Sequence, residues 1–264
     1  MKNRFLIIPG KCTLEKVSNC DFLFPLQGFC VGMSQTFSLE SIPDCSYVYV
    51  NCLLDSIQIE EFQKLLPLFP KKVKGIVFED LGILNILQEN HLHVETIFYG
   101  THAICSSYTA NAFLQDVDTV ILSNDITKEE IEKILQKVTK KVGLYIFGHL
   151  PYMYSRRTLL TNYSKHYSLD YKNQRIVKEQ FSKQEFLVVE DAYGTMFYDT
   201  RVFDGRVFLE KDVSYFLIDL HLENISSVKN FMDDFLRGKD FPNSTDGFLY
   251  RKTIYRLPPK GGAK

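Results

Sequence analysis

Short apolar runs recur along the chain and alternate with stretches in which apolar residues return every three or four positions. Each run is rich in β-branched or aromatic side chains and ends at a polar residue or a turn former. Continuous apolar runs of this length are typical of strands that are buried on both faces. The predicted strands are Phe5–Ile8, Asp21–Pro25, Tyr47–Asn51, Gly75–Phe78, Thr96–Tyr99, Thr119–Ser123, Gly143–Phe147 and Tyr215–Asp219, and Phe186–Val189 is a further candidate.

Amphipathic helices are predicted between these strands. Ser56–Leu68 and Ile225–Leu236 each place their apolar residues on one helical face, and Thr127–Lys140 opens with the capping box Thr-Lys-Glu-Glu. Strands that alternate with helices indicate parallel βαβ units. Because no Gly-rich dinucleotide turn is present, the pattern favours a closed (β/α)8 TIM-barrel-like fold over an open doubly wound sheet.

Two regions break the alternation. Residues 165–212 are polar and rich in tyrosine, and Val188–Tyr198 and Arg201–Leu209 within them resemble strands, which predicts a β-rich insertion. Arg251–Lys264 carries five positive charges and no acid, and its Pro-Pro and Gly-Gly pairs predict disorder at its end. We therefore expect one domain over residues 1–240 and a short basic tail over 241–264.

Composition narrows the functional classes. The chain has 264 residues, 45% of them hydrophobic, and a formal net charge of −1, so it can build one sizeable core and has no overall basic field for nucleic acid. The N-terminal apolar run, Phe5–Ile8, is too short for a signal peptide, and no run approaches the roughly 20 residues of a membrane span. These features predict a cytoplasmic protein without a membrane partner.

The cysteines do not form a metal-binding pattern. None stands in a Cys-x-x-Cys pair or has a histidine at zinc-finger spacing, so buried free thiols are the expected state. Three histidines that follow predicted strands are far apart in sequence, and their spacing does not enforce a metal site. We therefore predict no metal site. The six cysteines are Cys12, Cys20, Cys30, Cys45, Cys52 and Cys105.

Candidate chemistry gathers where predicted strands end, because the active site of a parallel barrel forms at the carboxyl ends of its strands. Glu79, His102, His149 and His221 each follow such a run. We predict catalytic roles for Glu79, His149 and His221 and ligand binding for His102. The alternative is structural: neighbouring Asp80 and Asp125 would cap helices, and a strand-end histidine is more often a hydrogen-bonded structural residue.

The stretch Gly148–Arg157 is the most distinctive in the chain. It is expected to leave a buried strand, turn at Pro151, and expose two tyrosines and two arginines. Arginine forks match phosphate and carboxylate, and tyrosine rings stack on bases, so an anionic ligand, either a small carboxylate or RNA, is predicted. The alternative is a solvated turn whose arginines cap helix carbonyls. The predicted ligand-binding residues here are Tyr152, Tyr154, Arg156 and Arg157.

No conventional hydrolase or nucleotide motif is present: there is no Gly-x-Ser-x-Gly elbow, His-Glu-x-x-His helix, Walker loop or Gly-x-Gly-x-x-Gly turn. However, the segment Phe147–Thr161 resembles the signature of peptidase family U32. That signature has a strand, a Gly, a small residue, Leu, Cys, and then Tyr-Ser-Gly-x-Cys-Leu-Leu-Ser. Val77–Gly82, Val120–Thr127 and Glu190–Thr195 are similar to further elements of the family in the same order, so the resemblance covers roughly residues 20–238.

The resemblance implies a barrel-like core. Many members bind an iron–sulfur cluster through four cysteines, and several act in oxygen-independent hydroxylation of tRNA, ribosomal RNA or quinone precursors, with prephenate as oxygen donor in the tRNA branch. Here the two signature cysteines fall at Pro151 and Thr158, and no cysteine follows Cys105. Iron–sulfur clusters require thiolates, so we expect no cluster and no other cofactor, with prephenate entering only as co-substrate of a complex.

Three functions remain open. The first is a cluster-free accessory subunit in tRNA uridine hydroxylation, with a cysteine-bearing U32 paralogue and tRNA as partners. The second is a U32-type peptidase, a collagenase-like hydrolase. The third is a non-enzymatic binding barrel.

Overall fold

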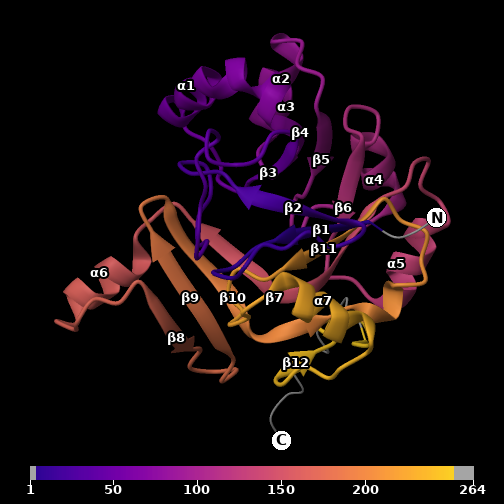
Figure 1. Cartoon of the computed structure of the whole chain (residues 1–264). Coiled ribbons are helices and arrows are strands. Elements are labelled where there is room, and N and C mark those ends of the chain that lie inside the picture. Colours follow the sequence, from indigo (N-terminus) through magenta and orange to yellow (C-terminus); the bar gives the residue numbers. More distant parts are fainter. Residues whose placement is uncertain (1–3, 253–264) are drawn as a thin grey trace, which may run out of the picture.

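A computed structural model describes residues 4–252. Eight parallel strands form a closed barrel in the order β11-β1-β2-β3-β4-β5-β6-β7, and β7 pairs with β11 to close it (Figure 1). This confirms the predicted (β/α)8 TIM-barrel-like fold. The strands are β1 (Phe5–Ile8), β2 (Cys20–Pro25), β3 (Ser46–Val50), β4 (Val73–Phe78), β5 (Glu95–Phe98), β6 (Thr119–Leu122), β7 (Gly143–Ser155) and β11 (Tyr215–Asp219).

Helices follow the barrel strands from β3 onward, and those after β3, β4, β5, β6 and β11 cover the outside of the barrel (Figure 1). Residues 9–19 and 26–45 connect the first three strands without a helix. The helix predicted over residues 127–140 is shorter in the structure, where it ends at Leu135. The helices are α1 (Ser56–Leu65), η1 (Leu66–Leu68), α2 (Phe69–Lys72), α3 (Leu81–Glu89), α4 (Ser107–Phe113), α5 (Lys128–Leu135), α6 (Leu159–His166), η2 (Arg206–Phe208) and α7 (Val228–Leu236).

A polar cluster closes the amino-terminal end of the barrel. Glu95 accepts hydrogen bonds from the hydroxyls of Tyr47, over 2.6 Å, and Tyr215, and the two hydroxyls lie 2.9 Å apart. Arg4 donates to Tyr47 over 3.1 Å and lies over the ring of Tyr215. Burial raises the pKa of Tyr47 to about 12, so it stays a neutral donor. At this end of a barrel such a cluster stabilises the fold rather than serving chemistry.

Strand β7 continues far beyond the barrel. It runs from Gly143 to Ser155, so the predicted turn at Pro151 is wrong. Proline lacks an amide donor and is tolerated in a sheet only where the ladder is irregular. Pro151 faces Tyr198 at a register shift, which leaves no ladder bond for it to break. Earlier in the strand, Gly148 has φ 131°, and a Cβ there would approach the Asp219 carbonyl oxygen to 2.6 Å.

The outer half of β7 belongs to an antiparallel sheet with β10 (Gly194–Asp204), β9 (Glu185–Asp191) and β8 (Gln174–Lys178), while β12 (Ser244–Thr245) pairs with β10. This confirms the β-rich insertion, although 201–209 is the end of β10 followed by a 3-10 turn. One face of the sheet packs over the carboxyl end of the barrel. A buried apolar cluster joins them: Val31 and Cys52 from the barrel loops, and Val189, Met196 and Tyr198 from the sheet.

The buried carboxylate of Glu190 anchors α6 to this sheet. It is 2% exposed and accepts hydrogen bonds from the main-chain N–H groups of Leu160, over 2.6 Å, and Thr161, over 3.0 Å. The Thr195 hydroxyl also donates to it over 3.0 Å. Thr158, the residue at the N-cap position, makes no side-chain cap. A carboxylate from a neighbouring strand therefore satisfies the free N–H groups at the start of α6.

Half of the predicted basic tail, residues 253–264, lies outside the described residues. Among residues 4–252, no helix has the length and apolar character needed to cross a bilayer.

Candidate functional site

A cavity of about 390 Å³ lies at the carboxyl end of the barrel, beneath the start of the insertion sheet. Its wall combines apolar side chains with a carboxyl, a hydroxyl and an imidazole. Concave sites with these properties are the usual places for small ligands. The lining residues are Leu53, Glu79, Gly100, Thr101, His102, Pro151, Tyr152, Met153, Tyr154 and Met196.

Glu79 follows β4 directly and supplies the carboxyl of this cavity. It accepts hydrogen bonds from the hydroxyls of Tyr49, over 2.7 Å, and Thr101, over 3.1 Å. Burial raises the pKa of Glu79 to about 7, against the lowering effect of these two donors. A carboxyl with this pKa is present in both protonation states near neutral pH, which suits a general acid or base.

His102 stands on the other side of the cavity, in the turn after β5. Its Nδ1 contacts the carboxylate of Asp125, which follows β6. That hydrogen bond raises the pKa of His102 above its ordinary value, although partial burial opposes it. Asp125 therefore pairs with His102 and does not cap a helix, since Thr127 is the N-cap residue of α5. Asp80 does cap α3, as the structural alternative predicted.

Tyr152 and Tyr154 form the β7 wall of the cavity. The Tyr152 hydroxyl donates to Asp199 over 2.9 Å, and burial raises the pKa of Tyr152 to about 12. The Tyr154 hydroxyl donates to the Tyr193 carbonyl over 3.2 Å. Both rings are thus held in place by the insertion sheet. Of the residues predicted from the sequence, Glu79, His102, Tyr152 and Tyr154 share this cavity.

His149 and His221 do not line the cavity. His149 uses both ring nitrogens: Nε2 lies 2.9 Å from Glu223, and Nδ1 lies 2.7 Å from the Asp199 carbonyl oxygen. Burial lowers the pKa of His149, but these acceptors outweigh it and raise the pKa above its ordinary value.

His221 is more deeply buried, at 3% exposure. Its Nδ1 contacts Asp219 over 2.5 Å, and its Nε2 has no hydrogen-bond partner within residues 4–252. The two histidines lie where β7 and β11 close the barrel.

The two arginines lie beyond the cavity, where β7 ends. Arg156 pairs with Asp55, the N-cap residue of α1, so it contacts a carboxylate rather than helix carbonyls. Arg157 is exposed, and within residues 4–252 its guanidinium forms no ion pair. Arg157 is therefore the freer of the two for an anionic ligand.

Two residues that shape the site were not singled out from the sequence. Tyr49, near the end of β3, does not line the cavity but donates to Glu79, and Met196 lines the cavity from β10. Tyr49 looked like one more apolar strand residue, and its polar end gave no signal. Met196 depends on the pairing of β10 with β7, which no local pattern specifies.

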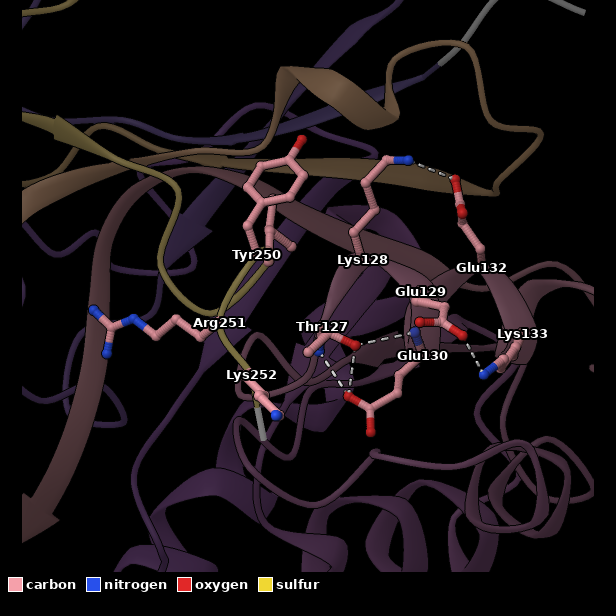
Figure 2. Close-up of a pocket in the computed structure, with 10 residues that line it drawn as sticks. Thr127, Lys128, Glu129, Glu130, Glu132, Lys133, Tyr250, Arg251 and Lys252 are labelled. Atoms are coloured by element: carbon pink, nitrogen blue, oxygen red, sulfur yellow. Dashed lines mark hydrogen bonds and ion pairs between the residues drawn. The ribbon is translucent and has the colours of Figure 1, made fainter. Parts of the chain in front are cut away.

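A larger open groove of about 570 Å³ lies outside the barrel, between the start of α5 and residues 249–252 (Figure 2). Its charged side chains largely form ion pairs with one another. Thr127 and Glu130 form a reciprocal capping box, and ion pairs link Lys128 to Glu132 and Lys133 to Glu129. Figure 2 shows Arg251 pointing away from these acidic groups. Since the helix N-terminus is already capped, we do not assign a function to this groove.

The residues present do not fit the four-thiolate cluster that the family resemblance implies. Pro151 offers no ligand atom, and Thr158 offers only a hydroxyl. All six cysteines are free thiols, and no group of three His, Cys, Asp or Glu side chains within residues 4–252 is arranged to hold a metal ion.

Comparison with known proteins agrees with this fold. A solved structure described as that of the U32 peptidase Mk0906 aligns over 83% of this chain and 92% of its own, with 13% sequence identity and a TM-score of 0.50. At that identity the likeness supports the fold alone. No curated protein matches the sequence. The model of peptidase family U32 matches residues 44–193, which is more than half of the chain. The chain belongs to peptidase family U32.

Proposed function

We propose that this protein is a cluster-free accessory subunit in tRNA uridine hydroxylation and that its barrel-end cavity receives the uracil base. The observation that carries the proposal is one cavity in which Glu79, Thr101 and His102 face apolar and aromatic walls. Enzymes that modify a base take it out of the stack into a pocket of this kind, where aromatic and apolar side chains flank the ring.

The polar groups complement uracil. Its Watson–Crick edge has one N–H donor between two carbonyl acceptors. The ionised carboxylate of Glu79 is an acceptor for that N–H, and a protonated His102 is a donor for a carbonyl, while the Thr101 hydroxyl donates to Glu79. The tyrosines Tyr152 and Tyr154 supply aromatic surface beside them, and Arg157 lies outside the cavity where a phosphate would approach.

The accessory role follows from the absent thiolates. Pro151 lines the cavity in place of a signature cysteine. In our proposal this chain binds and positions the uridine, and a cysteine-bearing U32 paralogue carries the redox chemistry with its own cluster. His149 and His221 then act as positioning residues that hold the loop after β11.

A deletion strain tests this function. Mass spectrometry of its tRNA nucleosides should show loss of hydroxyuridine, restored by the wild-type gene and by the control Glu60→Gln on the exposed face of α1, but not by Glu79→Gln. A pull-down with the wild-type chain should return a cysteine-bearing relative. Unchanged hydroxyuridine in the deletion strain would rule the proposal out.

A U32-type peptidase is the second candidate. It is favoured by the placement of Glu79, with a pKa near 7, and the His102–Asp125 pair on the same cavity, since hydrolysis needs a general acid and a general base. Purified protein incubated with gelatin and peptide libraries tests it. Cleavage that falls about 10²-fold or more in Glu79→Gln supports this reading; cleavage that survives Glu79→Ala, His149→Ala and His221→Ala points to a contaminant. If neither activity is found, the non-enzymatic binding barrel remains.

A further inference from the structure

Strand β8 forms the free edge of the insertion sheet. It ends the strand order, with β9 as its neighbour, and no other strand within residues 4–252 pairs with it (Figure 1). The main-chain hydrogen bonds to β9 involve alternate residues: the amide of Glu190 donates to the Asn173 carbonyl, and that of Glu179 to the Gln184 carbonyl. In an antiparallel ladder the residues between them, Gln174, Ile176 and Lys178, direct their N–H and C=O groups outward.

The side chains of β8 are unusual for an exposed edge. Ile176 is 65% exposed, Val177 39%, and Phe181 in the adjacent turn 88%. Val177 also lines two apolar hollows on the outer face of the sheet, which it shares with Phe197. Natural edge strands normally avoid such apolar surface because it invites pairing with another chain.

The charged side chains of β8 are arranged so that two antiparallel copies of this strand are complementary to each other. Arg175, Val177 and Glu179 alternate with the outward-bonding residues and share one face of the sheet. They give the order positive, apolar, negative. When a second identical strand approaches antiparallel, with the two-fold axis at Val177, Arg175 of each copy meets Glu179 of the other. In the same register Ile176 of one copy lies opposite Lys178 of the other. These two residues can then exchange main-chain hydrogen bonds, because their N–H and C=O groups point outward from the sheet.

We propose that two copies of this chain dimerise by antiparallel pairing of their β8 strands about Val177. The pairing joins the two insertion sheets into one, buries Ile176 and Val177, and forms two symmetric Arg175–Glu179 ion pairs. The Glu179 carboxylate is already oriented, since it accepts hydrogen bonds from the amides of Phe181, over 2.9 Å, and Ser182. The dimer is independent of the function proposed above.

Charge reversal tests the register. Analytical ultracentrifugation of the full chain should give a dimer. Arg175→Glu and Glu179→Arg should each place two like-charge pairs across the interface and weaken the dimer about tenfold or more. The double reversal Arg175→Glu/Glu179→Arg should restore it. Lys64→Glu on α1 is the matched control and should leave the dimer unchanged.

Crosslinking gives a second readout that does not depend on charge. Opposed residues in a non-hydrogen-bonded pair lie about 4.5 Å apart at Cα, within the range of a disulfide. In a background with the exposed Cys45 and Cys105 replaced by serine, Val177→Cys should form a covalent dimer on oxidation, and Ile176→Cys should not. A monomer at all concentrations, or equal crosslinking of both variants, would overturn the proposal.

Discussion

The Tyr49 hydroxyl donates to the carboxyl of Glu79 over 2.7 Å, so a strand that carries no proposed catalytic residue fixes the position of one that does. This hydrogen bond lowers the pKa of Glu79, but burial outweighs it and raises that pKa to about 7. The β3–β4 pairing places Tyr49 beside Glu79 and so helps to set the pKa of this carboxyl.

This raised pKa predicts a pH-dependent stability. Folded Glu79 keeps its proton up to about pH 7, whereas the unfolded chain loses it near the ordinary value of about 4.3. Its contribution to stability is therefore complete below the unfolded pKa and is lost as pH rises through 7. Glu79→Gln should gain stability relative to wild type between pH 5 and 8, measured by urea unfolding at each pH. A constant difference across that range would contradict the assignment.

The pair of His102 and Asp125 makes a prediction that needs no substrate. Asp125→Asn removes the charge that keeps the imidazole protonated, so the pKa of His102 should fall. Titration of the histidine ring signals by NMR measures this shift. The ring signals of His166, on α6, serve as an internal control and should be the same in both proteins. If His102 titrates unchanged, the contact with Asp125 does not form in solution.

Glu190 should be essential for the insertion sheet. Glu190→Ala leaves the amides of Leu160 and Thr161 without their acceptor, which should cost at least about 2 kcal/mol of unfolding free energy. Hydrogen exchange should accelerate first in α6. Glu185→Ala on the same strand removes only an exposed ion pair with Lys178 and should cost less than about 1 kcal/mol. Equal losses in the two variants would show that Glu190 acts no differently from a surface carboxylate.

Glu95 should contribute to stability without affecting the cavity. Glu95→Ala leaves the hydroxyls of Tyr47 and Tyr215 without their shared acceptor, at a cost of about 1–3 kcal/mol. Thermal unfolding measures the loss, and Glu89→Ala at the exposed end of α3 is the control. A change in ligand binding at the opposite end of the barrel would show that this cluster does more than hold the strands.

The arginines after β7 should contribute to tRNA affinity through phosphates. Arg156→Ala/Arg157→Ala should weaken binding of an unmodified tRNA transcript and lower the salt dependence of the binding constant by about one phosphate contact per arginine used. Because Arg156 is paired with Asp55, most of the loss should come from Arg157. Lys64→Ala/Lys239→Ala is the control, and an equal loss there would indicate binding without a defined surface.

The sequence predicted the barrel because each buried strand is a continuous apolar run. β1 and β11 coincide with predicted runs, and the others differ by one or two residues at an end, except for β7. β7 was missed beyond Phe147 because Pro151 normally ends a strand. Only the irregular pairing with Tyr198 makes the proline acceptable, and that depends on a strand almost fifty positions away.

The site was predicted in part for a similar reason. Glu79 and His102 could be placed at strand ends from the pattern alone, whereas the two other histidines were predicted to share the same rim. The sequence does not show that the ring of His149 contacts the distant Glu223 or that the ring of His221 contacts the nearby Asp219. Such partners decide whether a strand-end histidine is available for chemistry.

One uninterrupted strand, β7, supplies hydrogen bonds to the barrel through its first half and to the insertion sheet through its second. The barrel and the insertion sheet therefore cannot be exchanged between relatives as separate modules. Removing the rest of the insertion sheet would expose the main-chain groups in the outer half of β7. Mechanical pulling or partial denaturation should unfold the barrel and the insertion sheet in one cooperative event, since no linker separates them at β7.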